Sequence, residues 1–321
     1  MLLAVSDAAS AGVLSASTVW SFYYFQQDLV GTVPNADTGN FADYPTLGID
    51  ANALYIGCNM FTSAPSFAGT TGFVVRKTSI LSGGAIVVTA FRSLITSSHF
   101  GPYTPQGVDN FDLGQTSTTA GYFIGVSNNV AGRLVVRRVS DSGGTPTISS
   151  NINVAVNSTE EPASVPHLGN TGGTLGNLDA IDSRLFGAFL RKGRLWTAHN
   201  IEVDSTGTAL KGGGRNGARW YELNASSPTA TPNPVQIGTV FDPVATNPRF
   251  YWIPAVTVSG QGHAALGCSI AGANERANAA FTGRLASDSL GTMQAPTAYT
   301  STAASYNPRD GSGNPIDRWG D

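Results

Sequence analysis

Five polar side chains could do chemistry in this sequence, and they lie near the ends of repeated apolar segments. Three are aspartates, one is an arginine just after the third aspartate, and one is a histidine near the end of an apolar segment: Asp43, Asp109, Asp182, Arg184 and His199. Carboxylates that converge can act as general acid and base, or can hold Ca²⁺. An arginine can hold an anionic group, and an imidazole can act as a base near neutral pH. These residue types therefore suit a hydrolase.

Each of these residues also has a structural interpretation. An aspartate that begins a strand can accept backbone hydrogen bonds and fix a turn, and a residue that recurs in register is typical of a scaffold. Arg184 can pair with Asp182 or Asp179. His199 can pack in neutral form with one hydrogen bond, although it departs most sharply from the repeat, because the equivalent positions are small and apolar: Val5, Cys58, Val126 and Cys268.

The elements that position these residues follow from a repeat. One short apolar segment, which ends in Ser or Asn two residues after a small residue, occurs five times, at residues 2–6, 54–59, 122–127, 195–200 and 264–269. The last residues of the five copies are 53, 68, 73 and 69 positions apart. Such regular spacing indicates a repeat architecture.

Other segments recur around each copy. An inner strand is expected before it, at residues 43–49, 109–114, 182–189 and 251–258, with turn residues between. A third strand is expected after it, at residues 20–25, 72–77, 133–138, 218–223 and 280–285, and a fourth is clearest at 85–91. Four antiparallel strands per repeat are typical of a propeller blade.

The sequence therefore predicts an all-β fold, a single β-propeller domain over residues 1–321 with about five four-stranded blades. The blades are expected near residues 1–36 with 317–321, then 41–100, 105–160, 180–243 and 249–305. The blade at residues 1–36 begins at its second strand, so we expect it either to be incomplete or to be closed by the C-terminal residues as its inner strand, with Asp321 at the position of Asp43. A strand from a neighbouring molecule is another route to closure. An unpaired blade edge would otherwise favour self-association.

A ligand is expected where the inner strands start and the second strands end, because these points share one face of a propeller. The residues expected to bind it are Tyr44, Asn59, Asn128, Asn200, Tyr251, Trp252, Arg318 and Trp319. The aromatic rings suit sugar rings or apolar ester groups. Packing between blades is the alternative role for these aromatic residues.

The composition narrows the classes of partner. Charged residues make up 12% of the chain, and the formal net charge is −3, so no basic stripe for nucleic acid is expected. No apolar run approaches the ~20 residues of a membrane span. Cys58 and Cys268 are predicted to be small buried residues. The low lysine content favours a secreted or periplasmic protein whose export signal lies outside these residues, and a cytoplasmic protein is the alternative.

Two stretches carry a resemblance to a known class. Residues 41–50 with 53–56, and residues 318–321, resemble bacterial exported propeller proteins of the broad sialidase-like kind. The resemblance implies a propeller and a secreted setting. Sialidase chemistry would add an arginine triad, a tyrosine nucleophile and Asp-box turns, and residues 287–292 only approximate one such turn. The cluster of polar residues on the expected ligand face, rather than this resemblance, leads us to expect an axial pocket that hydrolyses a glycan or an ester-type substrate. The alternatives are a non-catalytic module that binds carbohydrate or protein and a structural adhesin.

Overall fold

A computed structural model describes residues 1–7, 12–31, 34–96, 99–227 and 229–319. The chain divides into two compact units, and each is described by itself. Unit 1 comprises residues 1–128 and 136–152, and unit 2 comprises residues 129–135 and 153–321. In the described part of the chain, no helix is long and apolar enough to cross a membrane.

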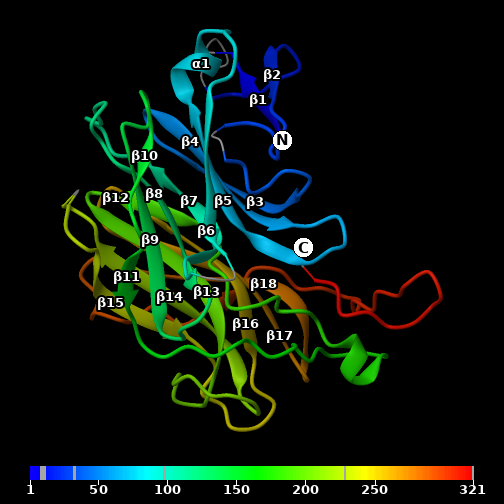
Figure 1. The fold of residues 1–321 in the computed structure, drawn as a ribbon. Helices are drawn as coiled ribbons and strands as arrows, with labels where there is room; N and C mark the ends of the chain where they lie inside the picture. The colour runs from blue at the N-terminus through cyan, green and yellow to red at the C-terminus, as the bar shows by residue number, and fades with distance from the viewer. Residues whose placement is uncertain (8–11, 32–33, 97–98, 228, 320–321) are drawn as a thin grey trace. The chain divides into compact units, whose positions relative to one another are not determined.

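Unit 1 is built from antiparallel strands (Figure 1). A hairpin of β1 (Leu2–Ser6) and β2 (Trp20–Tyr24) comes first. A four-stranded sheet follows in chain order, with the short helix α1 (Lys77–Leu81) before its last strand: β3 (Phe41–Ile49), β4 (Ala53–Phe61), β5 (Phe67–Arg76) and β6 (Val88–Ile95). The next strands also pair in chain order: β7 (Pro102–Asn110), β8 (Gly121–Ser127), β9 (Arg133–Ser140) and β10 (Thr147–Ile148).

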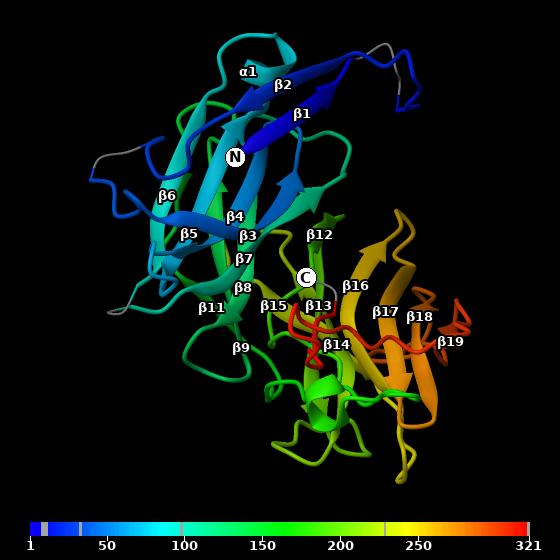
Figure 2. The same ribbon diagram turned by 90° about the vertical axis from the view of Figure 1, so that its right-hand side faces the viewer.

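Unit 2 contains two more antiparallel sheets in chain order, and Figure 2 shows the second one clearly. The first sheet is β12 (Ala188–Arg191), β13 (Arg194–Val203), β14 (Arg215–Asn224) and β15 (Asn233–Val240). The second is β16 (Phe250–Val258), β17 (Ala264–Gly272), β18 (Glu275–Arg284) and β19 (Thr297–Ala298). Strand β11 (Ile152–Ala155) and the 3-10 helix η2 (Gly173–Gly176) precede them.

Each unit has its own apolar core. In unit 2, Trp196 and Trp220 stack with ring centroids 5.8 Å apart, against Leu266 of the next sheet. In unit 1, Phe25 packs on Phe73 at 5.3 Å. Both cysteines are free and buried, as predicted. Burial of the apolar strand faces is the main force that holds each sheet in place.

The predicted fold class is confirmed. The chain is all-β in character, and two of its sheets, β3–β6 and β16–β19, are four-stranded antiparallel meanders, which is the topology of a propeller blade. Strands β12–β15 pair in chain order in the same way, within a larger sheet. All five copies of the repeated segment lie in strands, namely β1, β4, β8, β13 and β17. The number of blades and the single-domain boundaries stay predictions.

Two of the expected inner strands were placed wrongly. The third blade was expected to start its inner strand at Asp109, but β7 runs from Pro102 to Asn110, so Asp109 lies at its end. Asp182 lies before β12, which begins only at Ala188. The three aspartates therefore do not occupy equivalent positions. They cannot be explained as one repeated scaffold residue.

The feature that does recur is a strained bulge in the inner strands. Tyr44, Thr104 and Ile253 have φ values of 51°, 43° and 49°, and each precedes a proline. The pairing register shifts at each of these points. Proline within a sheet is confined to edges and bulges, and positive φ is rare for β-branched residues. Ile181, with φ 61°, repeats the strain before Asp182. Bulges of this kind re-aim neighbouring side chains.

The C-terminal segment makes contacts in unit 2. The Ser305 hydroxyl donates to the Leu168 carbonyl at 2.8 Å, and the Asp179 amide donates to the Asp317 carbonyl at 2.6 Å. These bonds explain why the segment lies along unit 2. Asp321, which was expected at the Asp43 position, is outside the described residues, so closure of the first blade stays a prediction.

Candidate functional site

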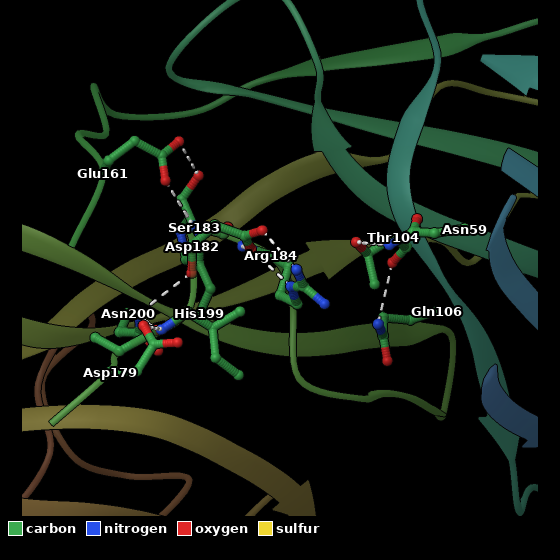
Figure 3. Close-up of polar contacts among 12 residues, drawn as sticks. Asn59, Thr104, Gln106, Glu161, Asp179, Asp182, Ser183, Arg184, His199 and Asn200 are labelled. Atoms are coloured by element: carbon green, nitrogen blue, oxygen red, sulfur yellow. Dashed lines mark hydrogen bonds and ion pairs between the residues drawn. The ribbon is translucent and has the colours of Figure 1, made fainter. Parts of the chain in front are cut away.

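The predicted site residues fall into one group in each unit. Unit 2 holds Asp182, Arg184, His199, Asn200, Tyr251, Trp252, Arg318 and Trp319, and unit 1 holds Asp43, Tyr44, Asn59, Asp109 and Asn128. Within unit 2, Asp182, Arg184, His199 and Asn200 belong to one hydrogen-bond network around residues 182–184, drawn in Figure 3.

An ion pair lies at the centre of the unit 2 network. Arg184 donates from Nε to Oδ1 of Asp182 at 2.7 Å and from Nη2 to Oδ2 at 2.6 Å. Its backbone amide also donates to Oδ1, at 2.9 Å. The Asp182 side chain is 28% exposed and that of Arg184 is 11% exposed. The pairing of Arg184 with Asp182, one of the predicted alternatives, is confirmed, and the carboxylate is held in a fixed orientation while still reaching solvent.

A second carboxylate joins this network through Ser183. Glu161 accepts the Ser183 backbone amide at Oε2 (2.9 Å) and the Ser183 hydroxyl at Oε1 (2.8 Å). Glu161 is exposed and lies in a long loop before η2. Two carboxylates, Asp182 and Glu161, thus flank Ser183 (Figure 3). Glu161 is not predictable from the repeat, because it lies in a loop that has no counterpart in the other repeats.

His199 is fully buried and contacts the backbone of Ser183. Its Nδ1 lies 2.6 Å from the Ser183 carbonyl, which can only accept, so Nδ1 carries the proton and donates. Its Nε2 therefore accepts from the Tyr221 hydroxyl at 2.8 Å. Burial is the main cause that lowers the His199 pKa to about 4, and burial also raises the pKa of Tyr221. The neutral, packed histidine of the structural interpretation is what these contacts describe.

The buried imidazole predicts a pH-dependent stability. Since the pKa is about 4 in the folded state and about 6.5 in the unfolded chain, the unfolded state binds the extra proton as the pH falls. Stability is therefore lost from about pH 6.5 downwards, by about 2.5 kcal/mol near pH 4.5. Urea unfolding of the parent protein and of His199→Gln, near neutral pH and near pH 4.5, measures this loss of stability. The variant should lack this share of the loss, and equal losses in both proteins would contradict it.

Asn200 ties three segments of unit 2 together. Its Nδ2 donates to the Ala180 carbonyl at 3.0 Å and to the Asp182 carbonyl at 3.3 Å, and its Oδ1 accepts the Ile253 amide at 2.8 Å. Ile253 lies in the β16 bulge and Ile181 in the loop before β12, and both have positive φ. The Asn200 side chain is fully buried, so its contacts with the protein hold these two strained backbone points in place.

The predicted aromatic residues differ in exposure. Trp252 is fully buried and packs on Trp319 with centroids 5.7 Å apart, and Trp319 Nε1 donates to the Ser269 hydroxyl at 3.1 Å. These two rings fit the packing alternative. Tyr251 is buried in its strand but lines a cavity of about 750 Å³ together with Asp242, Arg249, Asn274 and Glu275. Arg318 is exposed in the C-terminal segment.

In unit 1 the predicted residues serve the bulges and strand ends. Asn59 donates from Nδ2 to the Thr104 hydroxyl at 3.1 Å, while its buried Oδ1 has no hydrogen-bond partner in the described part of the chain. Asn128 is exposed and accepts the Gly101 amide at 3.1 Å. Asp43 is exposed and lies opposite Asn59 in the β3–β4 register, next to the half-buried Tyr44. Ligand binding by these residues stays a prediction.

Asp109 accepts the Ile49 backbone amide at 2.9 Å, and burial raises the pKa of its carboxyl. The raised pKa means that the charged carboxylate is less stable in the folded state than in water. In Asp109→Asn the side-chain oxygen can still accept the Ile49 amide, and the buried charge is removed. The free energy of unfolding near neutral pH should therefore be unchanged or up to about 1 kcal/mol higher. Asp109→Ala should lose about 1 to 2 kcal/mol, because it strands the Ile49 amide. Chemical denaturation of both variants tests this, and an equal loss in both would be inconsistent with the expectation.

The Ca²⁺ prediction lacks a ligand set of protein side chains. Over the described ranges, no group of three or more His, Cys, Asp or Glu residues could hold a metal ion. The carboxylates of Asp182 and Asp109 are instead occupied by the guanidinium and amide donors given above.

Comparisons with known proteins give structural likeness only. No family model and no curated protein matches the chain. A GH43_12 retrieved from capybara gut metagenome has a TM-score of 0.37 at 14% identity and covers 79% of this chain and 41% of its own. A xylan β-1,4-xylosidase from Bacillus halodurans has a TM-score of 0.39 at 12% identity and covers 80% and 42%. The catalytic domain of a Coprinopsis cinerea GH62 α-L-arabinofuranosidase has a TM-score of 0.38 at 9% identity and covers 84% and 71%.

The chain thus spans about two fifths of the length of the first two of these solved structures. With TM-scores below 0.5, none of the likenesses carries an inference to this chain. What the site can do has to follow from its own residues.

Proposed function

We propose that the chain binds a glycan against the segment 179–184 of unit 2 and hydrolyses a glycosidic bond there. The observation that supports this is the pair of carboxylates, Asp182 and Glu161, on either side of Ser183. Most glycoside hydrolases use two carboxyl groups, one to protonate the leaving oxygen and one to act as base or nucleophile. A pair that is fixed by neighbouring hydrogen bonds meets the need for preorganisation.

The two carboxylates would take different roles in this proposal. Glu161 is exposed, so it can exchange a proton with solvent and deliver it to the leaving oxygen. Asp182, held by Arg184, would stabilise the positive charge that develops on the sugar ring or orient a water molecule. His199 touches only protein and acts as a positioning residue, because it fixes the Ser183 carbonyl. Arg184 keeps the Asp182 carboxylate in its plane.

One observation favours a second function, carbohydrate binding without turnover. Both oxygens of Asp182 accept hydrogen bonds from Arg184. A carboxylate with both oxygens in an ion pair has fewer lone pairs left for a water molecule or a reacting group, while the pair together still offers donors and acceptors to sugar hydroxyls. The polar cavity beside Tyr251 would then extend the binding surface within unit 2.

A combined screen separates these functions. The purified chain is incubated with chromogenic glycosides and esters, and the same preparation is applied to a glycan array. Release of the chromophore from a glycoside supports the hydrolase, and release from esters alone would replace it by an esterase. Binding without release supports the second function. If the chain neither binds nor cleaves any member, both proposals fail and a structural role takes their place.

A further inference from the structure

A second pocket of unit 2 lies at the other end of β13 from the Asp182 network. It has a volume of about 340 Å³, within the range of small-ligand sites. Two hairpin turns form its rim, one between β12 and β13 and one between β16 and β17. Trp196, Val258 and Leu290 contribute apolar surface. His199 of the network lies three residues along β13 from Trp196 and five from Arg194, so about 10 to 17 Å of strand separates this pocket from the network.

The pocket gathers positive charge in a chain whose net charge is negative. Four cationic residues line it against one carboxylate: Arg191, Lys192, Arg194 and Arg284, with Glu222. The whole chain contains only 18 lysines and arginines and has a formal net charge of −3. Such a local excess attracts anions, because partly desolvated charges are poorly screened.

Arg284 is the buried cation of this set, with only 4% of its surface exposed. Its Nε donates to the Thr292 carbonyl at 3.2 Å and its Nη2 to the Asp288 carbonyl at 2.9 Å, and the guanidinium lies 5.9 Å from the Trp220 ring centre. Within the described part of the chain, Nη1 makes no hydrogen bond. The nearby Asp288 carboxylate accepts the Leu285 amide. The guanidinium is therefore fixed before any ligand arrives, which lowers the entropic cost of binding.

Arg191 and Arg194 flank the tip of the β12–β13 turn. The side chain of Arg194 is 40% exposed and its Nε lies 3.7 Å from Oε1 of Glu222, beyond hydrogen-bond distance. Glu222 accepts a closer hydrogen bond from the Gln236 amide. A methyl group at Gly260 would lie 3.2 Å from Arg191 Nη2, so the missing side chain lets this guanidinium approach the facing turn. Arg191 and Arg194 thus line the pocket from the β12–β13 turn, and Arg284 lines it from the end of β18.

We propose that this pocket binds an oxyanion, either a carboxylate, a sulfate or a phosphate, carried on a ring that rests against Val258 and Leu290. Guanidinium groups suit this chemistry, because their planar donors match oxyanions with two parallel bonds. The site is separate from the Asp182 network and does not depend on hydrolysis. It gives the chain selectivity for acidic over neutral ligands.

The test uses four sugars with one ring type and different charge: glucose 6-phosphate, glucose 6-sulfate, glucuronate and glucose. Binding to the full chain is measured by calorimetry or NMR at about 25 mM salt, where charge interactions are weakly screened. We expect saturable binding of at least one anionic sugar, no binding of glucose, and affinity that falls as salt is raised. The strongest of the three anions identifies the natural group. If glucose binds as well as the anionic sugars, or none binds, the proposal is overturned.

Three variants locate the site. The double variant Arg191→Gln with Arg194→Gln should weaken binding at least about tenfold, as expected for lost charge-assisted hydrogen bonds. Arg309→Gln removes an exposed cation elsewhere in unit 2 and should leave the affinity unchanged. Glu222→Gln removes the opposing charge and should tighten binding several-fold, a gain that unfolding cannot produce. Equal weakening by the double variant and by Arg309→Gln, or weaker binding by Glu222→Gln, would contradict the assignment.

Discussion

Asp182→Asn is expected to lower the turnover number on the best glycoside substrate about 1,000-fold, with KM within about threefold of the parent value. Asparagine is close in size and its Oδ1 can still accept the Arg184 backbone amide, as Asp182 does at 2.9 Å. The backbone bond that shapes the segment is therefore retained, while the bond from Arg184 Nη2 and the charge that stabilises the transition state are lost. Steady-state kinetics with circular dichroism as a check on folding measure this.

A matched variant controls for the loss of one carboxylate from unit 2. Asp204 is partly exposed and accepts the Thr206 and Thr208 amides in a turn after β13. Asp204→Asn should leave the kinetics of the parent unchanged. If Asp182→Asn kept activity within about threefold of Asp204→Asn, the catalytic role of Asp182 would be ruled out.

Asn200→Ala is expected to lower the free energy of unfolding of unit 2 by about 3 kcal/mol. The loss is smaller if water enters the site and replaces the missing hydrogen bonds. Alanine leaves the Ala180 and Asp182 carbonyls and the Ile253 amide without the partners that Asn200 supplies. The strained residues Ile181 and Ile253 lose their common support at the same time. Urea denaturation near neutral pH measures the change.

Asn128→Ala supplies the comparison for this prediction. Asn128 directly follows the second strand β8, whereas Asn200 lies within β13, and Asn128 is exposed and accepts one hydrogen bond, from Gly101. Its replacement should cost less than about 1 kcal/mol. A loss at Asn200 no greater than the loss at Asn128 would mean that Ile181 and Ile253 keep their conformations without the Asn200 side chain.

The repeat was the part of the fold that sequence could predict. Its second strands are nearly continuous apolar runs because both faces of these strands are covered, as the burial of β4 and β13 shows. Such runs are visible in a sequence without knowledge of tertiary structure. The inner strands were harder to predict, because Asp109 and Asp182 suggested strand starts at positions where the structure has none. The Tyr44-Pro45, Thr104-Pro105 and Ile253-Pro254 pairs carried the better signal.

The candidate site was only partly accessible to the same reasoning. The sequence pointed to Asp182, Arg184, His199 and Asn200, which the structure brings into one network. It could not reveal Glu161, because the contact with Ser183 spans 22 positions and comes from an irregular loop. Nor could it assign His199 to the interior, since the type of an ionisable residue does not disclose its burial.

The position of the bound glycan tests the proposed function most directly. A crystal structure of Asp182→Asn, soaked with the oligosaccharide that the parent cleaves, would trap the uncleaved ligand. We predict a sugar ring against residues 179–184, with its glycosidic oxygen within hydrogen-bond reach of Glu161. An intact sugar bound elsewhere, with Asp182 and Glu161 both facing solvent, would contradict the proposed site.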